Sequence, residues 1–96
     1  MAITYSPVKR ATTLRERQLD FADAENVFDS ERLATFEDER FAYGEPRFIT
    51  AGWLDARMVL ITWTPRGADR RVISMRHCHA KEERKLLRRF ESLRGL

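Results

Sequence analysis

Cysteine is almost absent from this sequence, which has a single one, Cys78, among its 96 residues. A lone cysteine cannot form an internal disulfide, as suits a reducing cytoplasm. Long apolar runs are also absent. None approaches the roughly 20 residues of a membrane-spanning helix, and the first residues lack the apolar core of a signal peptide. We therefore expect a cytoplasmic protein that does not contact membranes.

Repeats and low-complexity linkers are absent as well. The chain is long enough for one modest hydrophobic core and too short for two, so we expect residues 1–96 to form a single domain. With 43% hydrophobic and 34% charged residues, the composition is that of an ordinary globular protein, neither disordered nor membrane-bound.

Charge is unevenly distributed along the chain. Residues 70–96 contain nine lysines and arginines and three glutamates, a net charge of +6. Residues 1–69 contain nine basic and twelve acidic residues, a net charge of −3. The basic C-terminal part favours a polyanion or an acidic partner. A solvated helix face explains the same charge equally well, so charge alone does not identify the partner.

Two helices are predicted near the N-terminus. Ser6 is a fair N-cap with Pro7 at the first helical position, so a helix should run from there to about Arg17. A second helix should occupy the segment DFADAENVFD, with Asp20 as its cap. The apolar residues that fall on one face of this helix are Phe21, Ala24, Val27 and Phe28.

Strand patterns occupy most of the remaining chain. The segment ITYSP is compatible with a short strand, and another is expected over Leu33–Phe36, before an acidic loop closed by Gly44 and Pro46. Three more runs, alternating or rich in β-branched residues, are separated by turns at 55–56 and 66–69. These predicted strands are residues 47–53, 57–64 and 70–75.

A last helix is predicted from about Ala80 to Leu93, with basic residues around one apolar stripe formed by Leu86, Leu87, Phe90 and Leu93. This order of elements predicts an α+β fold. We expect an antiparallel sheet of about four strands, with the two N-terminal helices packed on one face and the basic helix at the C-terminus. The other face of such a sheet can stay open to solvent, and a ligand could lie there.

Three pieces of the sequence carry a resemblance to a known family: FADAENVFD at 21–29, YGEPRFITAGW at 43–53, and RRVISMR at 70–76 before a helix rich in glutamate, lysine and arginine. In this order and spacing they resemble the BrnT family of type II toxins, compact ribonucleases with a RelE-like fold. The resemblance implies a cytoplasmic, metal-independent ribonuclease that acts on RNA and inhibits translation. It also implies a cognate antitoxin encoded by an adjacent gene, through which the pair would bind operator DNA.

The resemblance extends to particular residues. The family's Gly-Glu-x-Arg-Phe strand start and its ISxR strand are matched here by Gly44, Glu45, Arg47, Ile73, Ser74 and Arg76. Arg71 lies two residues before Ile73. In the family a glutamate follows the strand arginine by about six positions, which selects Glu82, or Glu83 if one residue is inserted.

One part of the family pattern is missing. Before the second helix the family usually carries a Lys-His-Gly run, and the aligned positions here are Glu16, Arg17 and Gln18. A basic residue remains only at Arg17, and the imidazole is absent. If that histidine matters for catalysis, this protein either uses another group or cleaves poorly, and His77 and His79 are the available substitutes.

RNA cleavage without a metal needs a base for the 2′-OH proton, cations for the charge that develops on the phosphorane, and an acid for the leaving 5′-oxygen. Arginine suits the second role, because its planar fork pairs with phosphate oxygens. We assign the scissile phosphate to Arg76, and proton transfer to His77 or the following glutamate. The predicted catalytic residues are Arg47, Arg76, His77 and Glu82. The predicted RNA-binding residues are Arg17, Arg71, Tyr43 and Lys81.

These assignments have structural alternatives. His77 can make a local hydrogen bond near a helix start, and Glu82 can pair with Lys85 on an exposed helix face. In a regular strand Arg71 and Arg76 point to opposite faces, so only a bend would let both approach one phosphate.

Other residues have simpler interpretations than a functional one. The HCH run at 77–79 offers too few converging ligands for zinc, so no metal site is expected, and Cys78 is more simply a small buried residue. Four aromatic residues could stack on RNA bases or belong to the core: Trp53, Trp63, Tyr43 and Phe48. Strand spacing favours the core for Trp63.

Two further functions use the same residues. A nucleic-acid-binding module without catalysis needs the same basic and aromatic side chains, and the replacement at 16–18 keeps this alternative open. The third hypothesis is a protein-binding domain whose basic surface receives an acidic antitoxin segment. Cleavage of RNA by the purified protein excludes the binding module, and an adjacent gene for a ribbon-helix-helix-type protein favours the toxin.

Overall fold

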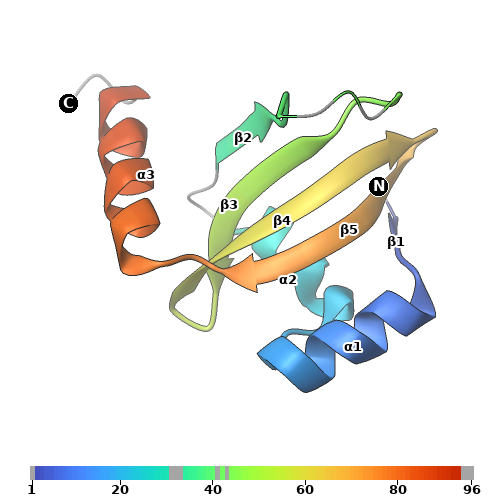
Figure 1. The fold of residues 1–96 in the computed structure, drawn as a ribbon. Helices are drawn as coiled ribbons and strands as arrows, with labels where there is room; N and C mark the ends of the chain where they lie inside the picture. Colours follow the sequence, from blue (N-terminus) through green and yellow to red (C-terminus); the bar gives the residue numbers. More distant parts are fainter. Residues whose placement is uncertain (1, 31–33, 41, 43, 94–96) are drawn as a thin grey trace.

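The computed structural model describes residues 2–30, 34–40, 42 and 44–93, and they form an α+β fold on one sheet (Figure 1). The strands are β1 (Ile3–Thr4), β2 (Ala34–Glu37), β3 (Phe48–Leu54), β4 (Arg57–Arg66) and β5 (Asp69–His77). The helices are α1 (Pro7–Arg17), the short 3₁₀ helix η1 (Phe21–Asp23), α2 (Ala24–Phe28) and α3 (Ala80–Leu93). The predicted α+β class is confirmed.

The sheet differs from the predicted one in the number and direction of its strands. Its order is β1-β5-β4-β3-β2, and the four strands β2 to β5 pair antiparallel, as expected. A fifth strand, β1, pairs parallel to β5, with Ile3 opposite Arg70 and Thr4 opposite Arg71. The sheet is therefore mixed, and the prediction of a wholly antiparallel sheet of about four strands was wrong.

The direction of β1 follows from the position of α1. Ser6 caps this helix, as predicted, by accepting a hydrogen bond from the backbone N–H of Lys9. The helix then follows the edge of β5, where Lys9 Nζ donates to the Ile73 carbonyl and Arg17 Nη1 to the Met75 carbonyl. The later residue of α1 bonds the later residue of β5, so the helix and the strand run in the same direction. The strand β1, which leads into α1, also runs parallel to β5.

The main hydrophobic core lies between the sheet and the helices η1 and α2. The predicted stripe is confirmed, since Phe21, Ala24 and Val27 are buried and Phe28 packs against them. The buried residues of this core are Leu19, Phe21, Ala24, Val27, Val59, Ile61, Val72 and Met75. The end of α2 passes so close to β3 that a Cβ placed on Gly52 would lie 2.8 Å from the Val27 carbonyl oxygen, which explains the glycine.

The predicted strands at 47–53, 57–64 and 70–75 correspond to β3, β4 and β5. The turn between β3 and β4 consists of Asp55 and Ala56, as expected, and both residues have positive φ angles, 50° and 65°. Such two-residue turns match the twist of a hairpin. The fourth predicted strand is β2, although Leu33, expected to begin it, lies outside the described residues.

An extra residue in β5 interrupts its pairing with β4. Thr62 lies opposite Ser74, but the next residue of β4, Trp63, lies opposite Val72. Ile73 is therefore a β-bulge, which shifts the alternation of side chains by one position. As a result Val72 and Met75 both face the core, and Arg71 shares the other face of the sheet with Arg76. The bulge supplies the irregularity that would be needed, so Arg71 and Arg76 share a face that a regular strand would not give them.

The face of the sheet opposite α1 and α2 is only partly covered, and we call it the second face. Here Leu86 and Leu87 of α3 pack against a small cluster of buried residues, Ala51, Met58 and Leu60. The side chains of Phe90 and Leu93, predicted for the same stripe, lie outside the described part. Within the described residues, no helix has the length and apolar character needed to cross a membrane.

Candidate functional site

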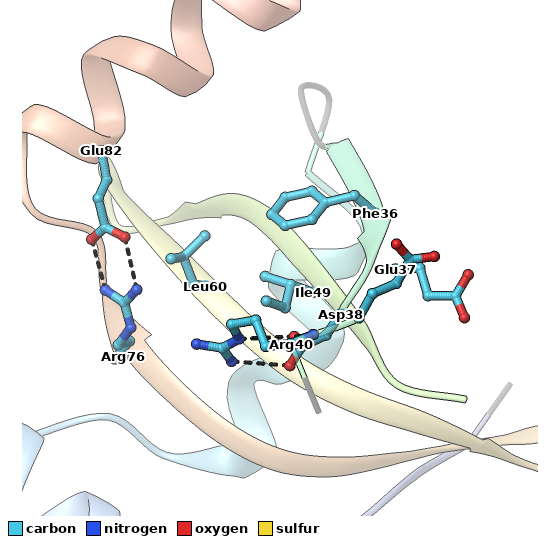
Figure 2. A pocket seen from close by; sticks show the side chains of 9 residues that line it. Phe36, Glu37, Asp38, Arg40, Ile49, Leu60, Arg76 and Glu82 are labelled. Carbon is cyan, nitrogen blue, oxygen red and sulfur yellow. Dashed lines mark hydrogen bonds and ion pairs between the residues drawn. The ribbon is translucent and has the colours of Figure 1, made fainter. Parts of the chain in front are cut away.

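A hollow of about 480 Å³ opens on the second face, between β2, the middle of the sheet and the start of α3 (Figure 2). We call it the pocket. Its lining residues are Phe36, Glu37, Asp38, Glu39, Arg40, Ile49, Leu60, Arg76 and Glu82. Two arginine–carboxylate pairs face the pocket from either side of an apolar floor, and Figure 2 shows Leu60 between them.

Strand register explains how the floor and its charges come together. Leu60 of β4 lies opposite Arg76 of β5. In the next row Thr62 lies opposite Ile49 on one side and Ser74 on the other. Residues opposite each other in an antiparallel sheet share a face, so these five side chains form one continuous surface on the second face.

Arg76 and Glu82 form a bidentate ion pair between the end of β5 and the first turn of α3. Arg76 Nη1 and Nη2 donate to the two carboxylate oxygens of Glu82, each at 2.8 Å. Glu82 also accepts from the backbone N–H of His79 at 3.2 Å, as a glutamate at the third helical position can. The sequence left Glu82 and Glu83 as alternatives, and the structure brings Glu82 to the arginine.

The ion pair changes the acidity of both partners. Hydrogen bonds from Arg76 lower the pKa of Glu82 to about 2, against the opposing effect of burial, and the bonds to Glu82 raise the pKa of Arg76. Glu82 is thus fully ionised at neutral pH, and as long as Arg76 holds it the carboxylate is a very weak base. A group that displaces the carboxylate from Arg76 would make it more basic.

The second pair joins Arg40 to Asp38 in the segment after β2. Arg40 Nε and Nη2 donate to the two carboxylate oxygens of Asp38, at 2.8 and 2.9 Å. The Asp38 side chain is only 1% exposed, whereas that of Arg40 is 67% exposed. The Asp38 backbone N–H also donates to the Arg47 carbonyl at 2.8 Å, which ties this segment to the start of β3. Sequence reasoning missed both residues, although an arginine two positions after an aspartate is a pattern that could have indicated them.

The two histidines of the 77–79 run lie in different surroundings. His77 lies opposite Val59, on the core face, so the structure does not bring it to the pocket. Burial, together with the positive charge of Arg57, lowers the pKa of His77, and its buried Nδ1 has no hydrogen-bond partner among the described residues. His79 is exposed at the start of α3 and close enough to Glu82 to lower the pKa of that carboxyl.

The other predicted basic residues are spread over the second face and its edge. Arg71 is on the second face because of the bulge. Arg47 directly precedes β3, half-buried, with its guanidinium 3.8 Å from Glu45. Arg17 lies at the C-terminal end of α1, where its bond to the Met75 carbonyl places it at the edge of β5. None of the three is among the residues that line the pocket.

Lys81 is exposed on α3, and Tyr43 lies outside the described residues. Trp63 belongs to the core side, as favoured, because its indole Nε1 donates to Thr50 Oγ1 and its ring packs edge-on against Phe28. Burial raises the pKa of the Cys78 thiol, which keeps it protonated. Within the described part of the chain, no three histidine, cysteine, aspartate or glutamate side chains gather as metal ligands would.

Comparison with known proteins gives one clear match. Residues 5–82 match the sequence model of a family described as the ribonuclease toxin BrnT of type II toxin–antitoxin systems. The matched range contains every residue that lines the pocket, up to Glu82. No individual curated protein matches the chain significantly.

The depressed pKa of Glu82 gives a first prediction. In an NMR titration of the side-chain carboxyls, Glu82 should titrate at about 2 in the unaltered protein and close to the ordinary glutamate value in Arg76→Ala. Asp20 is the internal control, because Arg10 lowers the pKa of its carboxyl to about 2 and Arg76→Ala leaves that pair intact.

The same pair predicts a pH dependence of stability. Since the pKa of Glu82 is lower in the folded than in the unfolded state, its stabilising effect is complete above the ordinary glutamate value and is lost as the pH falls toward about 2. The unfolding free energy of Arg76→Ala should therefore fall less steeply over this range. Equal slopes, or a Glu82 pKa that is the same in the variant as in the unaltered protein, would show that the ion pair is not formed in solution.

Proposed function

Because the chain belongs to the BrnT family of type II toxin–antitoxin ribonuclease toxins, we propose that it is a metal-independent endoribonuclease that binds the scissile phosphate of RNA at Arg76 and inhibits translation in the cytoplasm. The observation that carries this assignment is the bidentate Arg76–Glu82 pair on the wall of the pocket. A guanidinium already held in fork geometry fits two phosphate oxygens as well as it fits a carboxylate.

Binding of a phosphate begins with exchange of partners. The side chains of Arg76 and Glu82 are 41% and 37% exposed, so solvent and substrate reach both. An incoming phosphodiester takes the place of the carboxylate on the guanidinium, while the Glu82 backbone stays fixed in the first turn of α3. With its hydrogen bonds to Arg76 lost, the pKa of Glu82 rises toward the ordinary value, and the carboxylate is left beside the phosphate.

Cleavage then needs two proton transfers. The freed Glu82 carboxylate accepts the 2′-OH proton as the 2′-oxygen attacks phosphorus, and Arg76 stabilises the charge on the phosphorane. The bond to the 5′-oxygen breaks, which leaves a 2′,3′-cyclic phosphate on one product. The leaving 5′-oxygen takes its proton from an imidazolium, for which His79 is placed better than His77 because it lies close to Glu82.

A second candidate function is RNA binding without cleavage. Its support is the absence of an imidazole at the family's Lys-His-Gly position, where Arg17 instead bonds the Met75 carbonyl. The same pocket and the same arginines would bind RNA in either case, so only the chemistry separates the two functions. Glu82→Gln keeps Arg76 and removes the proposed base, so a comparison of RNA binding and RNA cleavage in this variant tests the two functions directly.

The antitoxin is the expected protein partner. We propose that an acidic, partly disordered segment of the antitoxin covers the basic surface around Arg47 and Arg76, blocks the pocket and leaves the rest of the antitoxin free to bind operator DNA. Co-expression and pull-down with the product of the adjacent gene tests this. The complex should form at low salt and weaken as salt rises, and absence of a complex at low salt would count against the proposal.

The catalytic assignment predicts a large effect of Arg76→Ala. Loss of one group that stabilises charge in a transition state typically costs roughly 10²–10³ in rate, so RNA cleavage in vitro and growth inhibition on induction should both fall by orders of magnitude. Glu82→Gln should also cleave poorly while it keeps its fold, because glutamine can still accept from the His79 N–H. Arg88→Ala, on the exposed face of α3, is the matched control and should only weaken binding slightly.

Three results would each contradict one part of the proposal. Wild-type activity in Arg76→Ala would remove the phosphate-binding role of this arginine. RNA binding without cleavage by the unaltered protein would favour the binding module. Loss of cleavage in EDTA would contradict metal independence.

A further inference from the structure

We propose that Arg40 is a second phosphate-binding residue, so that the pocket holds single-stranded RNA by two phosphates, one on each side of a nucleotide that lies over the apolar floor. This inference rests on the proposed function and adds that the substrate is single-stranded and is held at two phosphates. Arg76 holds the scissile phosphate, and Arg40 holds its neighbour.

The position of Arg40 supports the assignment. Arg40 and Arg76 both line the pocket, and both also line a smaller hollow of about 100 Å³ that shares Ile49 and Leu60 with it. Thr62 and Ser74, which carry hydroxyl groups, line the same small hollow as the two arginines. A chain of hydroxyls and guanidiniums on one surface is a set of donors, and a phosphodiester backbone presents only acceptors to it.

The two arginines differ in how firmly their carboxylates hold them. Asp38 is buried and tied through its backbone to Arg47, so it stays behind Arg40 and fixes the guanidinium plane. Arg40 itself is mostly exposed and lines the pocket. Glu82, by contrast, is accessible and can leave Arg76. One arginine is therefore a fixed anchor, and the other exchanges its partner during the reaction.

The space between the arginines suits a nucleotide. A volume of about 480 Å³ lies within the range of roughly 300–1,000 Å³ that small-molecule sites have. Phe36, Ile49 and Leu60 provide an apolar surface on which a base or ribose can lie. A base that reaches this floor must leave its stack, which is why the substrate is single-stranded.

The two guanidiniums influence each other, and Glu37 and Glu39 line the pocket beside the two ion pairs. Hydrogen bonds to Glu82 raise the pKa of Arg76, while burial and the positive charge of Arg40 lower it, so the two guanidiniums are close enough to repel each other.

The test uses substrates that differ by one charge. Each is a 2′-deoxy oligonucleotide of mixed sequence with a single ribonucleotide, so cleavage occurs only at the phosphate after that ribose. The phosphate on the 5′ or the 3′ side of the scissile one is replaced by an uncharged methylphosphonate. For the unaltered protein, one of the two replacements should lower kcat/KM by roughly tenfold or more. For Arg40→Gln, kcat/KM should be low on the fully charged substrate and insensitive to that replacement.

Control variants separate a lost contact from a lost fold. Arg66→Ala removes an exposed arginine paired with Glu45 outside the pocket, and it should keep the wild-type sensitivity. Arg40→Lys keeps the charge beside Asp38 and should restore part of the sensitivity that Arg40→Gln loses. Thermal unfolding of each variant establishes that the protein is folded.

The outcomes distinguish this inference from the proposed function. If Arg40→Gln responds to the methylphosphonates as strongly as the unaltered protein does, Arg40 does not bind the neighbouring phosphate, although the ribonuclease assignment stands. If the unaltered protein cleaves none of the substrates, the proposed function is contradicted, and this inference with it.

Discussion

One extra residue in β5 determines which side chains meet on each face of the sheet. Met75 is in the core, so in a regular strand Ile73 and Arg71 would also face the core and Val72 would face the pocket side. The bulge at Ile73 reverses this alternation, which buries Val72 and turns Arg71 toward the second face. The burial of Val72 and the position of Arg71 on the second face are therefore consequences of the same local irregularity.

The Arg76–Glu82 pair connects the fold to the proposed chemistry. It joins the end of β5 to α3, and the Glu82 carboxylate also satisfies a backbone N–H at the helix start. In the absence of substrate the carboxylate occupies the position that we assign to a phosphate, so the arginine keeps its orientation and is not left unpaired. Both side chains of this pair are partly exposed, whereas the Asp38 carboxylate that accepts from Arg40 is buried. In this account the Arg76–Glu82 pair has a structural role in the free protein, and Arg76 has a functional role when RNA is bound.

Much of the fold follows from local sequence signals, and the exceptions have physical reasons. The Ser6–Pro7 start of α1, the apolar stripe of α2, the Asp55–Ala56 turn and the span of α3 all depend on neighbouring residues, and each was predictable. The two-residue strand β1 is too short to show a direction, and the bulge at Ile73 has no glycine to mark it. In the site, Arg76 and Glu82 were found through the family pattern. Arg40 was missed because its place beside the pocket depends on β2 lying beside β3. His77 points to the core face because adjacent strand residues point to opposite faces.

The central claim is that a phosphate replaces Glu82 on Arg76, and a crystal structure of the protein with a 2′-deoxy oligonucleotide tests it most directly. The missing 2′-hydroxyl prevents cleavage and leaves the phosphates unchanged. We predict that two oxygens of one phosphate accept hydrogen bonds from Arg76 Nη1 and Nη2, with the Glu82 carboxylate turned away from the guanidinium. A complex in which the strand is bound while Arg76 and Glu82 remain paired would contradict the account.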